Sequence, residues 1–495
     1  MRDNKMNAIL FHPPSRMSEP DPPLGVVYLA SILEHAGCAT EVVDMEPQGV
    51  NLKQVRAILR SHKPLFVGIS FMTAQYSYMK QLVSTIKSEM RDVPIIAGGV
   101  HASALPEDLL TDVKEIDYVA VGEGEKTILE FFDYLRGRSR LSDIKGIVYR
   151  KDGAIVRNPS RELMTVDELN ALPPVRWDKL YDKKIYYRLP VYSKEVVPYF
   201  SLITARGCPY PCVFCDEVTI WKRRFRPISI DRTISETEFL YNRYGARDIQ
   251  ILDDAFTIVP NRVHQFCDRI IESGMKIRFK VCAHVNTVDL DMLRKMKQAG
   301  VVQVGYGVES GDQRVLDAIK KNQKLEDVER AFKLTKEADL LSYAFFMVGN
   351  LGEDFESVKK SAAFMKRIDP DFVSCAILTP YPGSEIYDIA SKNGWILERN
   401  WDKYITAAHR VCDYHPIARS DKMSGTEMLR AYYYLNSTFY FQKIRKRYGR
   451  LPFLNPLFYY EEIIKRIRVS GAKRFSYNVF NLLKQKLVSS TLNAS

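Results

Sequence analysis

Short apolar runs alternate with amphipathic stretches along most of this chain, and this alternation constrains the fold more than any other feature. In residues 1–145 the expected strands lie at 7–11, 39–43, 65–70, 94–97 and 118–121, and the expected helices at 24–35, 54–61, 76–89 and 125–134. Runs that are apolar on both faces are typical of parallel strands covered by helices on both sides. The first 145 residues are therefore predicted to form a doubly wound, Rossmann-like α/β domain whose ligands bind at the carboxyl ends of the strands.

A second alternation follows a linker at 146–195, which includes an edge strand near its start. Its expected strands lie at 199–204, 249–252, 278–283, 302–307, 343–348 and 372–378, with helices between them. This pattern predicts a partial (β/α)6 barrel over residues 196–390, with reactive groups in the loops after the strands. Residues 391–495 lose the alternation, and we expect a helical, basic and aromatic C-terminal region there.

Three of the eight cysteines lie within eight residues, in the loop after the first expected barrel strand: Cys208, Cys212 and Cys215. Eight cysteines are too few for a disulfide framework in 495 residues, so the cluster indicates metal or redox chemistry. Three thiolates at this spacing can hold three corners of a cubane iron–sulfur cluster and leave one iron open. The alternative is a structural zinc with a remote fourth ligand, Cys282 or His284, which the position at the barrel mouth disfavours.

This loop resembles the signature of the radical S-adenosylmethionine superfamily, and the matching residues are Arg206-Gly207-Cys208-Pro209-Tyr210-Pro211-Cys212-Val213-Phe214-Cys215. The resemblance covers about residues 195–390. It implies a [4Fe–4S] cluster whose open iron is chelated by S-adenosylmethionine. Reductive cleavage in that superfamily yields a deoxyadenosyl radical that abstracts hydrogen from an unactivated C–H bond. The resemblance also implies an electron donor of the flavodoxin or ferredoxin type.

The same resemblance assigns further residues to S-adenosylmethionine. Phe214 matches the aromatic position whose backbone contacts the adenine. Asp253 and Asp254 end the second strand, where many members carry Gly-Gly-Glu to hold the methionyl amino group. Which aspartate acts is open, and an N-cap of the next helix is an equal expectation for Asp254. Asn286 follows the third strand, where the ribose is usually bound, and could equally be a turn residue.

Two glycine-containing segments complete the assigned S-adenosylmethionine site. Gly305-Tyr306-Gly307-Val308-Glu309-Ser310-Gly311 resembles the fourth strand of the family, and Glu309 would face the cofactor. Val348, followed by Gly-Asn-Leu-Gly-Glu, lies in the loop after the fifth strand and is expected to meet the adenine.

The N-terminal domain resembles the cobalamin-binding domain that precedes the radical barrel in the cobalamin-dependent branch of this superfamily. That branch includes methyltransferases, the anaerobic magnesium-protoporphyrin monomethyl ester cyclase and lipid-modifying members. The residues assigned to cobalamin are Leu24, Gly25, Ser70, Thr73, Gly98, Gly99, His101, Gly122 and Glu123. Glycines at strand ends leave room for a corrin face. The D-x-H-x-x-G motif of an axial histidine is absent, although His101 lies in the corresponding loop, and a domain without a corrin is the alternative.

Basic charge is concentrated at the C-terminal end of the chain. From residue 441 onward twelve Lys and Arg face two acids, which gives +10 of the chain's net charge of +12. The favoured interpretation is a solvated helix face with its aromatics packed inward, followed by contact with an anionic membrane surface. Nucleic acid is disfavoured because no known binding module is present. No apolar run is long enough to span a membrane and the start has no signal-peptide core, so a cytoplasmic location, peripheral to a membrane at most, is expected.

The hypothesis from the sequence is a cobalamin-dependent radical S-adenosylmethionine methyltransferase that acts on an unactivated carbon of a small molecule or lipid. A radical oxidation, cyclisation or rearrangement without methyl transfer is the second hypothesis. A non-catalytic iron–sulfur scaffold is the third. The substrate contacts would come from loops and from the C-terminal region, where no motif identifies the substrate.

Overall fold

A seven-stranded sheet forms the N-terminal domain, in the order β2-β1-β3-β4-β5-β6-β7. The structure is a computed structural model that describes residues 7–14, 22–181, 199–404 and 416–449. The strands are β1 (Asn7–His12), β2 (Ala39–Asp44), β3 (Phe66–Ser70), β4 (Ile95–Gly98), β5 (Tyr118–Ala120), β6 (Ile147–Lys151) and β7 (Ala154–Arg157). The first five are parallel, whereas β6 and β7 add as an antiparallel hairpin, so the sheet continues to Arg157.

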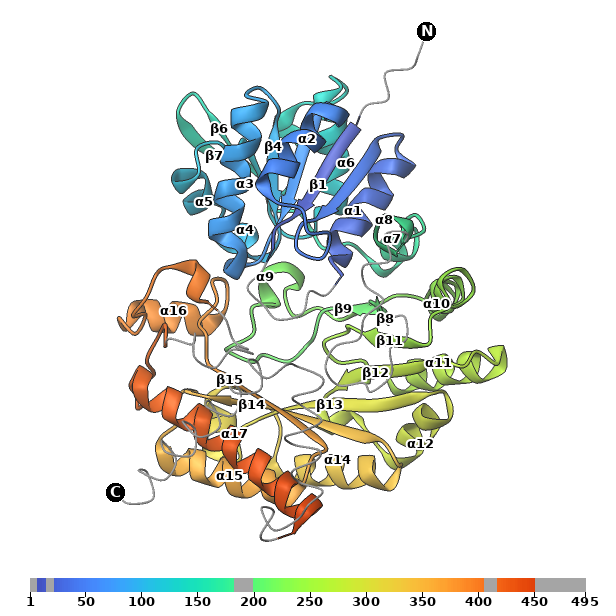
Figure 1. The fold of residues 1–495 in the computed structure, drawn as a ribbon, viewed down its shortest axis with the longest axis vertical. Coiled ribbons are helices and arrows are strands. Elements are labelled where there is room, and N and C mark those ends of the chain that lie inside the picture. The colour runs from blue at the N-terminus through green and yellow to red at the C-terminus, as the bar shows by residue number, and fades with distance from the viewer. Residues whose placement is uncertain (1–6, 15–21, 182–198, 405–415, 450–495) are drawn as a thin grey trace.

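Helices cover both faces of this sheet (Figure 1). They are α1 (Leu24–His35), α2 (Leu52–His62), α3 (Tyr76–Glu89), α4 (Val100–Ala104), α5 (Pro106–Asp112) and α6 (Gly124–Leu135). Side chains of one strand alternate between two cores: Leu10 of β1 packs on the face of α1 and α6, and Ile9 and Phe11 pack on the face of α3. The doubly wound domain expected from the apolar runs is confirmed.

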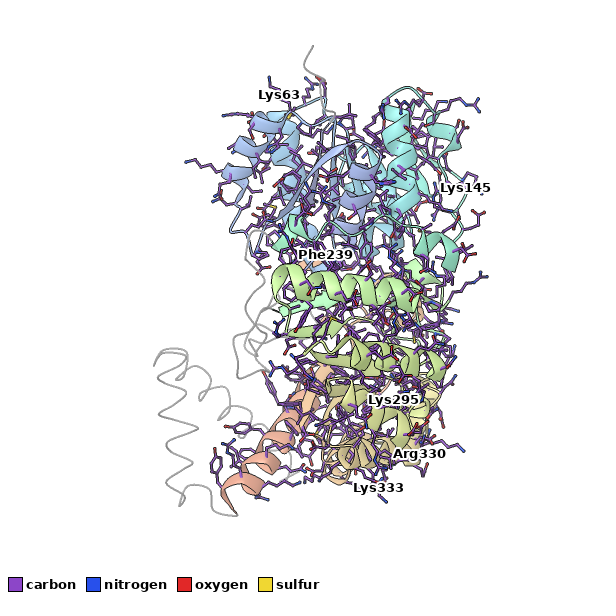
Figure 2. All side chains as sticks on the ribbon, turned by 90° about the vertical axis from the view of Figure 1, so that its right-hand side faces the viewer. Lys63, Lys145, Phe239, Lys295, Arg330 and Lys333 are labelled. Atoms are coloured by element: carbon purple, nitrogen blue, oxygen red, sulfur yellow. The ribbon has the colours of Figure 1, made fainter. Side chains whose placement is uncertain are left out.

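The second unit is a six-stranded, all-parallel sheet in the order β15-β14-β13-β12-β11-β8. Its strands are β8 (Tyr199–Leu202), β11 (Asp248–Ile251), β12 (Arg278–Ala283), β13 (Val301–Glu309), β14 (Leu341–Val348) and β15 (Phe372–Ile377). The outer helices are α10 (Ile230–Tyr244), α11 (Pro260–Ser273), α12 (Leu290–Gln298), α13 (Gln313–Ala318), α14 (Leu325–Glu337) and α15 (Phe355–Ile368). Because β8 and β15 do not pair, the barrel is partial, as predicted. Figure 2 shows the side chains of this unit, with Lys295 on α12 and Lys333 on α14 in its outer helical layer.

The described part of the C-terminal region contributes α16 (Glu385–Lys392) and the long helix α17 (Gly425–Tyr448), which packs along α15 and β15. Helix α17 begins with a capping box between Ser424 and Glu427. Tyr432 and Tyr433 are buried against the barrel, which agrees with inward-packed aromatics for this segment. The rest of the basic tail, residues 450–495, lies outside the described residues. Among the helices that the structure describes, none is long and apolar enough to cross a membrane.

The two units are stacked so that the carboxyl ends of the N-terminal strands face the barrel (Figure 1). Between them lies α9 (Val218–Trp221), which is part of the cysteine loop and packs on α4 of the N-terminal domain. The fold therefore places the loop with the three cysteines next to the expected corrin crevice.

Candidate functional site

The cysteine loop follows β8 and is closed at its base by a short antiparallel pair, β9 (Ala205–Arg206) with β10 (Arg226–Pro227). Gly207 opens the loop with a φ of +82°, and a Cβ there would overlap the carbonyl oxygen of Arg224. Only glycine fits this tight turn. The backbone N–H of Cys208 donates to the Glu217 carboxylate at 3.0 Å, which fixes the start of the cysteine run.

Cys208, Cys212 and Cys215 are free thiols. Burial raises the pKa of all three, that of Cys208 to about 11, so they need a metal centre to become thiolates. Among the described residues no group of three His, Cys, Asp or Glu side chains is arranged to hold a single metal ion. Three cysteines on one loop are the donor set that a [4Fe–4S] cluster with one open iron uses.

His284, one of the two candidate fourth ligands of the zinc alternative, is engaged in other contacts. The ring of His284 is stacked on Tyr210 with centroids 3.7 Å apart and planes at 7°. Its Nδ1 accepts from the backbone N–H of Asn286, and burial lowers the pKa of His284 to about 4. Cys282, the other candidate, is also a free cysteine.

A buried ion pair lies beside the cysteines. Lys321 Nζ is 2.9 Å from Glu309 Oε1, and the ammonium lies 5.6 Å from the centre of the Phe214 ring. Burial opposes the charge on Lys321, yet Glu309 and the neighbouring Cys212 keep its pKa above the usual value. Sequence analysis missed Lys321, because a lysine after a short helix carries no motif; only the fold brings it to Glu309.

The backbone of Glu309 has an unusual conformation. Its φ is +61°, and the pairing register of β13 with β14 shifts between Gly307 and Glu309. Such a bulge re-aims a side chain at the end of a strand. A Cβ at position 307 would crowd Lys321 Nζ and lie 2.6 Å from the Glu309 carboxylate, so a larger residue there would displace this ion pair.

Asp253 and Asp254 have different surroundings. Asp253 is buried and accepts from the backbone N–H groups of Thr204 and Ala205 at 2.6 and 2.9 Å and from the Thr204 hydroxyl at 2.5 Å. Asp254 has no ion-pair partner among the described residues, and burial by surrounding atoms followed by repulsion from Asp253 raises its pKa to about 6. The N-cap expectation for Asp254 is wrong, because α11 begins at Pro260 with Val259 as its N-cap.

Asn286 and Val348 were also assigned to S-adenosylmethionine, but their surroundings favour this role less. The Asn286 side chain is exposed in a short 3-10 turn and donates to the Asn322 carbonyl at 3.1 Å, as a turn residue would. Val348 is fully buried, and its carbonyl accepts the Leu378 N–H, so it offers no side-chain surface to a ligand. Glu353 structures the loop after Val348, since its carboxylate accepts the N–H groups of residues 349 and 350.

The expected corrin crevice lies along the carboxyl ends of β1, β3, β4 and β5. Cβ atoms at Gly25 and Gly122 would meet nothing within 4 Å, so both glycines border open space. Met72, just after β3, leaves 41% of its large apolar side chain exposed at this edge. Glycine is needed at position 99 for a local steric reason. The φ there is +98°, and a Cβ would lie 2.5 Å from the Phe71 carbonyl oxygen. Open space and exposed apolar surface suit the flat face of a corrin.

His101 is enclosed by aromatic rings. It is 2% exposed, and its ring centre lies 4.9 Å from that of Tyr76 and 5.1 Å from that of Trp401. Nδ1 contacts the Thr73 hydroxyl at 3.1 Å, and burial lowers the pKa of His101 to about 4. Trp401 comes from the C-terminal region, some 300 residues away, and no sequence pattern indicated this contact.

Glu123 was expected to bind cobalamin, but its carboxylate is already engaged by the protein. Its two carboxylate oxygens accept from Arg206 and Arg226 of the barrel and from the Met164 backbone, each at 2.8 Å. A carboxylate with these three partners has little capacity left for a ligand.

Comparisons with known proteins agree with this geometry. The B12 binding domain family matches residues 20–132, and the Radical SAM superfamily matches residues 202–365. The first match covers the crevice domain, and the second runs from the end of β8 into α15.

Relatives cover most of the chain. An uncharacterized methyltransferase of Pyrococcus horikoshii is 31% identical over 387 residues, 78% of this chain and 82% of the relative. An anaerobic magnesium-protoporphyrin IX monomethyl ester cyclase of Rubrivivax gelatinosus is 26% identical over 420 residues, 82% of this chain and 72% of the relative. The fold is that of the cobalamin-dependent S-adenosylmethionine radical enzyme OxsB, with a TM-score of 0.72, 17% identity and coverage of 99% of this chain and 72% of the other.

Proposed function

Since this chain belongs to the cobalamin-dependent radical S-adenosylmethionine enzymes, we propose that it is a methyltransferase that acts on an unactivated carbon of a small molecule. Its cofactors are a [4Fe–4S] cluster, S-adenosylmethionine and cobalamin. The observation that carries the proposal is the loop of three free cysteines at the barrel mouth, next to the open edge of the cobalamin domain.

Once bound, S-adenosylmethionine on the cluster supplies a radical that removes hydrogen from the substrate, and methylated cobalamin supplies the methyl group. The chain itself holds the cluster through Cys208, Cys212 and Cys215. The flanking turn at Gly207 and the Glu217 carboxylate hold the loop in shape. Stacking of Tyr210 on His284 covers one side of the loop and limits the access of water.

For S-adenosylmethionine we assign the methionyl ammonium to Asp254, because Asp253 is already saturated by Thr204 and Ala205. Phe214 and Asn286 keep their assigned places at the adenine and the ribose. Glu309 contributes through its pair with Lys321, which leaves the second carboxylate oxygen for a polar group of the ligand. Val348 contributes only by shaping the loop.

We assign the corrin to the open edge of residues 1–145 and S-adenosylmethionine to residues 196–390. The corrin-facing positions are Gly25, Ser70, Gly98, Gly99 and Gly122, whereas Leu24 and Thr73 are buried and contribute only by shaping this edge. His101 acts from behind this surface, where it holds Thr73 and packs on Trp401. On this assignment His101 would not be a ligand of the cobalt.

Isotope transfer from S-adenosylmethionine separates this function from its alternative, a cyclase-type oxidation or rearrangement, which the Rubrivivax relative favours. The anaerobically reconstituted protein, reduced by flavodoxin, is incubated with a small-molecule extract and S-adenosylmethionine that carries a trideuterated methyl group. A methyltransferase produces a metabolite that gains the labelled methyl, and Cys212→Ser abolishes it. Deoxyadenosine release with a product that carries no label supports the cyclase-type reaction and contradicts the methyltransferase.

A finer proposal concerns the tail, where residues after Gly449 contact an anionic membrane surface and bring the enzyme to a hydrophobic substrate. The support is its composition, which interleaves cations with aromatic residues. Tyr432, Tyr433, Tyr434 and Phe439 of helix α17 pack against the core, so we assign the contact to residues 450–495. Sedimentation with vesicles of anionic and of neutral lipid tests this, using the full chain and a form that ends at Gly449. Equal sedimentation of the two forms with anionic vesicles contradicts it.

A further inference from the structure

One buried charge network joins both ends of the cysteine loop to the N-terminal domain. Arg206 lies two residues before Cys208, and Arg226 lies directly opposite Arg206 in the β9–β10 pair. Both guanidinium groups reach across the domain boundary to Glu123, just before α6. The loop with the three cysteines is thus anchored at its entry and at its exit by the same carboxylate.

The contacts are short and directional. Arg206 donates to Glu123 Oε1 at 2.8 Å and to Glu125 Oε1 at 2.5 Å. Arg226 donates to Glu123 Oε2 at 2.8 Å and to the Met164 carbonyl at 2.9 Å, and the Met164 N–H returns a bond of 2.8 Å to Glu123. Arg206 divides its contacts between its two terminal nitrogens, Nη1 to Glu123 and Nη2 to Glu125, whereas Arg226 makes both of its contacts through Nη1.

The network is buried and balanced in charge. Its two arginine and two glutamate side chains are 4–8% exposed. Although burial disfavours both charges, Glu125 and Glu123 raise the pKa of Arg206, and Arg226 and Arg206 lower the pKa of Glu123. Loss of one member leaves an uncompensated buried charge. Such a network accepts one relative placement of the two domains, whereas an apolar interface tolerates sliding.

A close-packed contact supports the same loop at its middle. Helix α9 lies against α4, which begins at the crevice. Gly383, in the loop after β15, approaches both: a Cβ there would overlap Thr219 of α9 and lie 3.3 Å from the Ala104 Cβ of α4. The cysteine loop, α4 and the loop after β15 therefore meet here. The charge network fixes how the cysteine loop is oriented relative to the N-terminal domain.

We propose that Arg206, Arg226, Glu123 and Glu125 are positioning residues that set the distance between the cysteine loop and the corrin crevice. The inference rests on the proposed function, because only an enzyme that uses both cofactors in one turnover needs this distance held. A misplacement of about 1 Å is enough to slow a reaction about a hundredfold. These residues touch neither the substrate nor the reacting atoms, and they act through the loop and the domain that they join.

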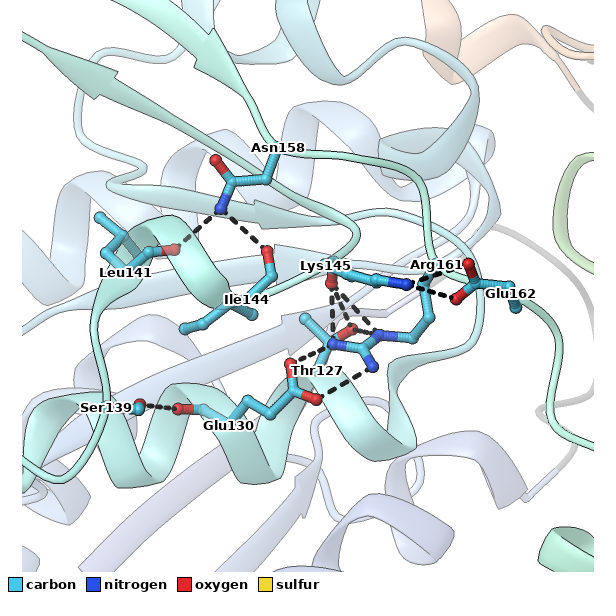
Figure 3. Close-up of polar contacts among 9 residues, drawn as sticks. All are labelled: Thr127, Glu130, Ser139, Leu141, Ile144, Lys145, Asn158, Arg161 and Glu162. Carbon is cyan, nitrogen blue, oxygen red and sulfur yellow. Dashed lines mark hydrogen bonds and ion pairs between the residues drawn. The ribbon is translucent and has the colours of Figure 1, made fainter.

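The test uses the full chain with two changes in the network and one outside it. Glu125→Gln removes one negative charge with little change of shape, and Arg206→Lys keeps the charge but loses the fork. The matched control is Glu130→Gln, which removes the partner of Arg161 within the N-terminal domain (Figure 3). Arg161 keeps its bond to the Thr127 hydroxyl there, and no contact across the domain boundary is lost.

Two measurements report the position of the cysteine loop and do not require catalytic turnover. Hydrogen–deuterium exchange of peptides over residues 205–227 is expected to be about tenfold faster in both network variants and unchanged in the control. In protein that carries both cofactors, pulsed electron paramagnetic resonance measures the dipolar coupling between cobalt(II) in the corrin and the reduced cluster. That coupling falls steeply with distance and is expected to weaken or broaden in the network variants, while the spectrum of each centre alone is unchanged.

Unchanged exchange and unchanged coupling in both network variants would overturn the proposal. Equal changes in the Glu130→Gln control would also overturn it, since they would show a general loss of stability. A network variant that no longer binds its cofactors is judged by exchange alone, and slow exchange there counts against the proposal. If the wild-type protein binds no cobalt or builds no [4Fe–4S] cluster, the proposed function fails instead, which metal analysis distinguishes.

Discussion

Protonation of His101 should destabilise the N-terminal domain at acid pH. The ring is 2% exposed, its neighbours are Phe71, Tyr76 and Trp401, and no charged group offsets its burial, which lowers its pKa to about 4. In the unfolded chain the pKa returns to about 6.5. The unfolded state therefore binds the proton first as the pH falls, and stability is lost below about pH 6.5 and in full near pH 4.

The magnitude follows from the two pKa values. A separation of about 2.5 units corresponds to about 3 kcal/mol in full, and about 2 kcal/mol of this is lost between pH 7 and pH 5. Other titrating groups also change stability in this range, so the prediction concerns the difference between the wild type and His101→Gln. The variant lacks the titrating ring and should lose about 2 kcal/mol less than the wild type over that interval.

Hydrogen–deuterium exchange of peptides over residues 95–104 measures the opening free energy of this domain separately from the barrel. The control is His62→Gln, which replaces an exposed histidine of α2 and leaves the ring contacts of His101 in place. Equal losses in the wild type and in His101→Gln would refute the reasoning, since they would show that the ring is not held neutral.

Three further changes test the site. Cys208→Ser should abolish the absorbance of the cluster near 400 nm and the reductive release of deoxyadenosine, with cobalt content unchanged by metal analysis; a retained cluster would contradict its assignment. Gly349→Ala should lower stability by about 2 kcal/mol more than Gly352→Ala in thermal unfolding, because both have a positive φ and only Gly349 is in contact with α17. Lys321→Met should cost about 3 kcal/mol by leaving Glu309 buried without a partner, and no loss would show that the pair is not formed.

The alternation of apolar runs predicted both α/β units because each parallel strand is buried on both faces. The strand at 278–283 and the helices at 24–35 and 76–89 have the predicted bounds. Short elements were missed for a physical reason. Helix α4 has five residues and α9 has four, too few for a helical period to be visible in the sequence.

The site was predictable where a motif carries the chemistry and unpredictable where partners are distant in the chain. The three cysteines are close in sequence, so their spacing was enough. Lys321 comes to Glu309 only through the bulged end of β13, and Trp401 comes to His101 only when the C-terminal region folds back on the N-terminal domain. No local sequence pattern predicts either of these two contacts.

The acids of the site show why motif residues of one chemical type take different roles. A carboxylate can serve a ligand only to the extent that the fold has not already satisfied its oxygens. Glu123 is used by two arginines and a backbone amide, and Asp253 by three donors of the β8–β9 connection. Asp254 has no ion-pair partner among the described residues, and its pKa is raised by burial and then by repulsion from Asp253, which a bound ammonium group would relieve. Neighbouring acidic residues thus have two different roles: one holds the site together and the other faces the ligand. Their hydrogen-bond partners determine which role each residue has.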